Sequence, residues 1–170
     1  MIEISTILYK MTLSSTSVAQ LVMGISDKQA RWKPSPSTWS MLEVVHHLLD
    51  IEREDFRPRL DRALHHPTAS LVEIDPSDWV LERAYNQADL QNVLEDYLEE
   101  RHRSLQWLQE LHAPNWEAVF TGSSGTLRAG DLLTAWMAHD FLHIRQLNEL
   151  HYAYLQERMQ PYQADYAGEW

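Results

Sequence analysis

The chain has 170 residues, which gives room for one ordinary domain but not comfortably for two. Its 14 Lys and Arg against 25 Asp and Glu give a formal charge of −11, which argues against nucleic-acid binding, because holding a phosphate backbone requires clustered basic side chains. It contains no Cys, and this excludes disulfides, thiolate zinc sites, Cys nucleophiles and cysteine-ligated iron–sulfur clusters. The 9 His and the carboxylates remain as metal ligands.

The composition is that of a folded globular protein. Hydrophobic residues make up 44% of the chain, and 5 Gly and 7 Pro are too few for a low-complexity sequence. No apolar run approaches the roughly 18 residues that a membrane-spanning helix requires. Glu3 and Lys10 interrupt the N-terminal segment and no small-residue cleavage site follows, so no signal peptide is indicated. We therefore expect a cytoplasmic protein that does not bind membranes.

The first half of the chain predicts two helices separated by a proline-rich break. Apolar residues recur every three or four positions from Ile4 to Ile25, which is typical of an amphipathic helix. The segment 33–37, with two prolines, ends this pattern. A second helix is expected to begin near residues 37–40 and to run into the low sixties.

Local signals mark the start of this second helix and one point inside it, and a connection is expected to follow it. Ser40 and Glu43 have the spacing of a capping box, in which each side chain satisfies an early backbone N–H group. Pro58 removes one backbone donor and predicts a kink. The residues 67–86 are expected to form a connection.

The second half predicts two further long helices, at 88–111 and 129–156, each with an apolar stripe at helical spacing. The acidic residues of the third helix fit a solvated face. Between the two helices, 112–128 is expected to be a loop whose Gly/Ser stretch at 122–125 forms a turn, because it lacks the Lys and the spacing of a phosphate-binding loop. The tail, 159–170, is predicted to be a loop.

Four helical patterns without strand alternation predict an all-α protein, a four-helix bundle with long connecting loops. Two of the three connections are long enough to cross over the bundle rather than form simple hairpins. We expect residues 1–170 to form a single domain.

His139 and His143 are the first candidate metal ligands. They are four residues apart, so both lie on one face of the fourth helix, within its apolar stripe. Buried imidazoles need partners for their ring nitrogens, and one divalent metal satisfies two rings at once. The alternative is a pair of core histidines bonded to a carboxylate or a carbonyl.

A third ligand must come from another helix. His46 and His47 both lie on apolar stripes of the second helix, and spacing alone does not choose between them. A third imidazole would leave one metal position open for water or substrate, as in catalytic sites.

The segment 139–143 also approaches the HExxH pattern of zinc proteases, but Asp140 stands where that pattern has Glu. Such proteases set the helix beside a sheet that binds substrate, and we expect no sheet. We therefore disfavour a protease.

The chain resembles the DinB-like superfamily, of the DinB/YfiT type, in three places. Trp39-Ser40, then Glu43, then His47-Leu48 are similar to its W-S-x-x-E…H-L pattern. The segment 138–147 is similar to its H-x3-H followed by Gln, and 165–170 is similar to a tail frequent in the family.

The resemblance implies a four-helix bundle of DinB-like type with a metal site of three histidines, which here would be His47, His139 and His143. It selects His47 over His46 because His47 directly precedes the Leu. Members include S-transferases that depend on low-molecular-weight thiols, and relatives of maleylpyruvate isomerase. The resemblance therefore implies that such a metal activates a thiol.

Other residues receive supporting or structural roles. Glu52 and Gln146 are candidates for orienting the imidazoles, and Asp140 is expected in a supporting contact or an ion pair. We expect the tryptophans at 39, 107 and 136 to fill core. The remaining histidines, His65, His66, His102, His112 and His151, are not expected to bind metal.

The sequence thus predicts a divalent-metal protein (Zn, Ni or Fe) that activates a bound water or thiol toward a small-molecule substrate, as a thiol-dependent transferase or a hydrolase. The alternative is a non-catalytic metal-binding or structural bundle protein of the stress response. The catalytic residues beyond the metal stay unknown. A homodimer is the candidate association state, because relatives are often dimers.

Overall fold

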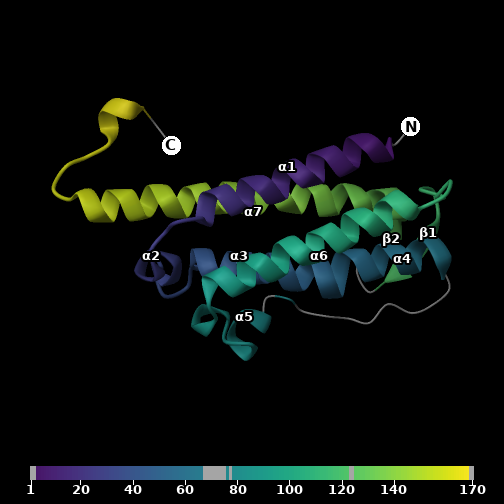
Figure 1. Cartoon of the computed structure of the whole chain (residues 1–170), viewed down its shortest axis with the longest axis horizontal. Coiled ribbons are helices and arrows are strands. Elements are labelled where there is room, and N and C mark those ends of the chain that lie inside the picture. Colours follow the sequence, from purple (N-terminus) through teal and green to yellow (C-terminus); the bar gives the residue numbers. More distant parts are fainter. Residues whose placement is uncertain (1–2, 67–75, 77, 123–124, 169–170) are drawn as a thin grey trace.

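A computed structural model describes residues 3–66, 76, 78–122 and 125–168. Four long helical units form a bundle, and shorter elements lie at its ends and in its connections (Figure 1). In chain order the elements are α1 (Ile4–Val22), α2 (Asp27–Arg31), α3 (Met41–Ile51), the π-helical turn η1 (Glu52–Phe56), α4 (Arg57–His65), α5 (Trp79–Glu82), the 3-10 turn η2 (Tyr85–Gln87), α6 (Leu90–Glu110), β1 (Val119–Gly122), β2 (Gly125–Arg128), α7 (Ala129–Met159) and the 3-10 turn η3 (Asp165–Ala167).

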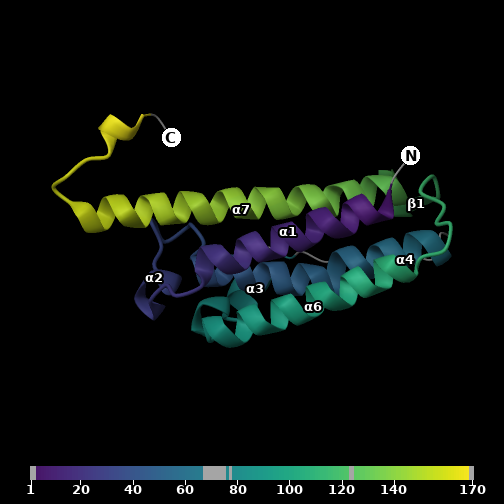
Figure 2. The same ribbon diagram turned by 45° about the horizontal axis from the view of Figure 1, so that its top comes forward.

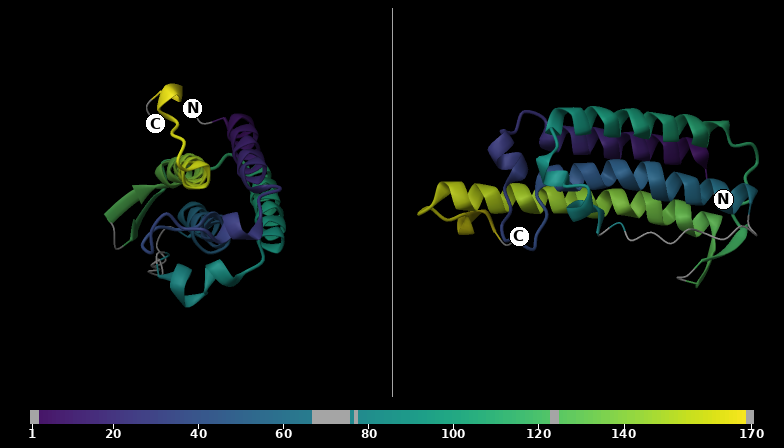
Figure 3. Two further views of the ribbon diagram at one scale, coloured as in Figure 1. Left: turned by 90° about the vertical axis from the view of Figure 1, so that its left-hand side faces the viewer. Right: turned by 90° about the horizontal axis from the view of Figure 1, so that it is seen from below.

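The connectivity of the bundle departs from a simple up-and-down order. Helices α1 and α7 run in one direction, and α3–α4 and α6 run in the other (Figures 1 and 2). α1 packs mainly against α6 and α7, and α3 packs against α6 and α7 (Figure 3). Because the neighbours α3 and α6 are parallel, the connection between them must be a crossover. The predicted four-helix bundle is confirmed. Part of the predicted connection at 67–86 lies outside the described residues, and its described part contains α5 and the start of η2.

Two hydrophobic clusters fill the bundle. One joins α1, α2, α3, α6 and α7 around residues such as Val18, Leu42, Tyr97 and Leu147. The other joins α1, α4, α6 and the start of α7 around Met11, Leu60, Leu108 and Trp136, with Phe120 from the hairpin. The apolar stripes of the sequence therefore face the interior of the bundle, where they form these two clusters. Among the described residues, no helix has the length and apolar character that crossing a membrane demands.

The second helical unit begins as predicted but changes geometry inside. The Ser40 side chain accepts a hydrogen bond of 3.2 Å from the Glu43 backbone, and the Glu43 carboxylate accepts one of 2.7 Å from the Ser40 backbone. This is the predicted capping box. The π-helical turn η1 ends two residues before Pro58, the position at which the sequence predicts a kink. Such single π turns are often found at functional sites.

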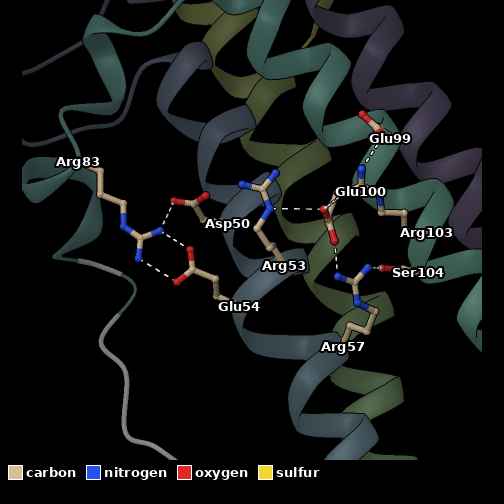
Figure 4. Close-up of polar contacts among 9 residues, drawn as sticks. All are labelled: Asp50, Arg53, Glu54, Arg57, Arg83, Glu99, Glu100, Arg103 and Ser104. Carbon is tan, nitrogen blue, oxygen red and sulfur yellow. Dashed lines mark hydrogen bonds and ion pairs between the residues drawn. The ribbon is translucent and has the colours of Figure 1, made fainter.

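Ion pairs tie this unit to its neighbours (Figure 4). Arg53 and Arg57 both approach the buried carboxylate of Glu100 on α6. On the other side, Arg83 bridges Asp50 and Glu54, with nitrogen–oxygen distances of 2.6 and 2.5 Å. The segment that follows α5 is thereby held against α3 and η1.

The prediction of a loop at 112–128 was wrong in part. β1 and β2 form an antiparallel hairpin in which Val119 is opposite Arg128, and it lies beside the start of α7 (Figure 3). The predicted turn at 122–125 joins the strands, but its two central residues lie outside the described part of the chain. Each strand has only four residues and β2 is exposed throughout, so the sequence shows no alternation of apolar and polar residues.

Candidate metal centre

Three imidazoles meet between α3 and α7. His47 lies on α3, and His139 and His143 lie on α7. The Nε2 atom of His139 is 3.3 Å from Nε2 of His47 and 3.1 Å from Nε2 of His143. One ligand atom from each residue lies within 4.8 Å of the others. The structure therefore brings together the three histidines that the family resemblance singles out.

The structure also distinguishes between His46 and His47, which spacing alone left as alternative third ligands. His47 is buried and points to α7, whereas the half-buried His46 stacks on Tyr85, with ring centroids 4.1 Å apart. His46 therefore faces η2, on another side of α3. Because consecutive helical residues differ by about 100° in direction, only one of them can face α7.

Burial keeps the three rings neutral. Loss of hydration, together with the nearby ring of His143, lowers the pKa of His47 to about 3. The pKa of His139 is lowered to about 3 by burial and by the neighbouring His143 and His47. Burial also lowers the pKa of His143. Neutral imidazole is the form that binds metals.

The tautomer of His143 follows from its neighbour Gln146. The Nδ1 atom of His143 lies 2.8 Å from Oε1 of Gln146, and an amide oxygen only accepts hydrogen bonds. Nδ1 therefore carries the proton, and Nε2 directs a lone pair toward His139. This is the orienting contact that was expected of Gln146.

The spacing of the nitrogens matches that of metal ligands. Two nitrogens bound at 2.0–2.1 Å in a tetrahedral site lie about 3.3 Å apart. The observed separations of 3.1 and 3.3 Å are close to this value. A divalent ion would accept one lone pair from each neutral ring, so the donor set fits such an ion. Three protein nitrogens leave at least one position for an exogenous ligand.

Glu52 does not orient an imidazole, contrary to the expectation from sequence. Its Oε2 atom accepts hydrogen bonds from Arg101 at 2.9 Å and from the indole of Trp136 at 2.8 Å. Burial raises the pKa of Glu52, and the positive charge of Arg101 opposes this rise. Since η1 begins at Glu52, the π-helical turn sets this carboxylate at the interface of α3, α6 and α7.

Asp140 forms one of the two contacts expected of it, an ion pair. Its carboxylate binds Arg101 in a bidentate manner, at 2.7 and 2.8 Å. Both side chains are almost completely buried. A carboxylate held in this way cannot serve as the general base of an HExxH protease, which agrees with the reading of the sequence.

Trp39 and a cavity border the histidines. The Trp39 ring lies 4.8 Å from that of His47 and parallel to that of His143 at 6.2 Å, between ring centroids. A cavity of about 620 Å³ opens beside His143; its lining is Pro34, Ser37, Thr38, Trp39, His143, Gln146, Glu149, Leu150 and Ala153. Most of these residues carried no signal in the sequence, because the cavity forms only where the segment before α3 crosses α7.

The remaining predictions concern the burial of three tryptophans and the positions of the other histidines. Trp136 is buried, and its indole N–H finds the acceptor that burial requires, whereas Trp39 and Trp107 are half-buried. The histidines at 65, 66, 102 and 112 are exposed. His151 contacts Leu21 and Gln29, away from the three-histidine cluster.

Comparisons with known proteins place this geometry in a family. A search of curated proteins finds no match. Among solved structures, YfiT from Bacillus subtilis, described as a probable metal-dependent hydrolase with an unusual four-helix bundle topology, matches with a TM-score of 0.77 at 20% identity. The match covers 88% of this chain and 86% of that one, and it shows a shared fold. The family model for the DinB superfamily matches residues 12–147, so the chain belongs to the DinB superfamily.

Proposed function

We propose that this protein is a divalent-metal-dependent enzyme whose metal is held by His47, His139 and His143. The observation that carries the proposal is the convergence of three neutral Nε2 atoms from two helices. Zn, Ni and Fe all accept three imidazoles, so the ligand set leaves the choice among them to measurement. The description of YfiT as a probable metal-dependent hydrolase supports the same class of chemistry.

When bound, such an ion lowers the pKa of a water or thiol in its open position and makes it a nucleophile near pH 7. The chain's own residues hold the three imidazoles in place and orient them. Gln146 fixes the Nδ1–H tautomer of His143, and Trp39 covers one side of the cluster. The cavity beside His143 has the size of a small-molecule site. The chain has no Cys, so any thiol must arrive as substrate or cosubstrate.

Metal content tests the ligand set. Protein purified without a metal-affinity tag should contain about one equivalent of divalent metal by plasma mass spectrometry. His139→Ala and His143→Ala should each remove it, while the exposed His102→Ala should retain it as a matched control. Equal metal in all four proteins would contradict the proposal.

Cobalt substitution then separates an enzyme from a metal-binding bundle protein. A low-molecular-weight thiol should change the visible spectrum of the cobalt protein, and ester or thiol-transfer substrates should turn over only in metal-loaded protein. A bound metal with neither response would favour the non-catalytic alternative. Sedimentation at two protein concentrations would test the predicted homodimer.

A further inference from the structure

We propose that the cavity beside His143 is a binding site for uncharged small molecules in which an apolar group is attached to a carbonyl oxygen, and that Gln146 recognises this oxygen. This inference rests on the proposed function, because it names the substrate class of the same centre. Its three supports are the chemistry of the cavity wall, the position of the cavity, and the hydrogen bonds of Gln146.

The wall of the cavity is largely apolar. Pro34, the half-buried Trp39, Leu150 and Ala153 supply carbon surface from two sides, the segment before α3 and helix α7. Such a surface favours an aromatic or aliphatic group, because burying apolar area is favourable in proportion to the area removed from water.

The charge of the wall selects against anions. Its lining residues include no Lys or Arg, and its ionisable carboxylate is Glu149. Glu149 is paired with Arg145 at 3.2 Å, but both side chains are about half exposed or more, where such pairs contribute little. In a chain with a formal charge of −11, a negatively charged group that lies away from the proposed ion would therefore find no compensating side chain on this wall.

Gln146 supplies the polar recognition. Its Oε1 atom accepts a hydrogen bond from the Nδ1–H group of His143, so its amide nitrogen must point away from that ring. Among the described residues, none accepts a hydrogen bond from this nitrogen, and Gln146 lines the cavity. Its N–H groups are therefore available to an acceptor that lies beside His143. A carbonyl oxygen there would be next to the proposed nucleophile.

Acetophenone is a suitable probe, because it is neutral, aromatic and carries an acceptor without a donor. We expect it to shift the nitrogen NMR signals of the Trp39 indole and the Gln146 side-chain amide, each assigned by its loss in Trp39→Phe or Gln146→Leu. Ethylbenzene, which has nearly the same shape without the oxygen, should shift Trp39 alone.

Two variants make the test specific. Gln146→Glu keeps an oxygen for His143 but removes the N–H donors, so it should weaken acetophenone binding by roughly 3- to 10-fold and leave ethylbenzene unchanged. Ala153→Phe should place a ring inside the cavity and weaken both responses, with metal content unaffected.

Absence of a Trp39 shift with acetophenone, or equal affinity in Gln146→Glu and the unaltered protein, would overturn the inference. Its failure differs from failure of the proposed function. If the protein holds stoichiometric metal but does not bind the probe, only the proposed substrate class is refuted. If it binds the probe but holds no metal, only the proposed metal centre is refuted.

Discussion

Arg101 and Asp140 are joined by two parallel hydrogen bonds of 2.7 and 2.8 Å in the interior of the bundle. Arg101 comes from α6, and Asp140 directly follows His139 on α7. The pair therefore fixes the rotation and height of α7 at the level where His139 meets His47. Glu52 on η1 binds the same guanidinium, so the contact links three helical units.

Replacing Arg101 by Met should destabilise the protein by about 3–5 kcal/mol, because two carboxylates would lose their counter-charge in the interior. Urea unfolding followed by circular dichroism measures this change. Arg103→Met is the matched control on the same helix: its side chain is 56% exposed and its ion pairs should contribute less than about 1 kcal/mol. Equal losses in the two variants would contradict the buried role of Arg101.

Metal should stabilise the folded protein, because the ligands meet only in the native state. A free metal concentration 100 times the dissociation constant adds about 2.7 kcal/mol to the free energy of unfolding. Thermal unfolding of apo protein with and without added zinc checks this. His143→Ala should lose the response and His102→Ala should keep it; stabilisation that survives in His143→Ala would place the ion elsewhere.

Gln146→Ala should weaken metal binding by about 10- to 100-fold, because partners that fix a ligand's tautomer typically contribute this much. Competition with a chromophoric chelator measures the affinity. Gln156→Ala, exposed on the same helix, controls for the loss of an amide and should leave the affinity unchanged. Indistinguishable affinities for the two variants would show that the 2.8 Å contact with His143 does not orient the ring.

The pair of Arg83 and Glu54 should make stability depend on pH. Hydrogen bonds from Arg83 hold the pKa of Glu54 below its ordinary value of 4.5. The stabilisation is therefore complete above pH 4.5 and is lost as the pH falls through the lowered native pKa. The difference in unfolding free energy between the unaltered protein and Glu54→Gln should be largest at pH 7 and should shrink below pH 4.5. In an Arg83→Met background the pH-dependent difference should become much smaller, because only the charge of Arg53 then still lowers the pKa of Glu54.

Ser40→Ala should cost about 1–2 kcal/mol, since Ser40 caps α3 and also donates a hydrogen bond of 2.7 Å to Asn86. The midpoints of urea unfolding, compared between proteins with the same dependence of the unfolding free energy on urea, measure this loss of stability. Ser26→Ala, which removes the cap of the short α2, should cost less because that helix has five residues and an exposed surface. A larger loss of stability in Ser26→Ala than in Ser40→Ala would mean that the capping box does not anchor α3.

The long helices were predictable because their apolar residues recur with the helical period over many turns. The two histidines of α7 were predictable as partners for the same reason. The choice of His47 over His46 needed the family resemblance, since both residues fall on apolar positions of α3 and only the direction of α7 separates them.

Other features depend on contacts between distant segments. Glu52 was expected near an imidazole, but Arg101, which is 49 residues away in sequence, binds it instead. The short elements α2 and α5 and the hairpin have too few residues for a period to emerge. The cavity beside His143 likewise exists only because the segment around Pro34 passes over α7.

His47 and His139 are 92 residues apart in the chain, yet their Nε2 atoms are neighbours. The cluster therefore exists only where α3 is docked on α7. An ion held there would stabilise this docked arrangement, because it binds the native state and not the separated helices. Loss of the ion would then raise the fraction of molecules in which the two helices come apart and become open to proteolysis.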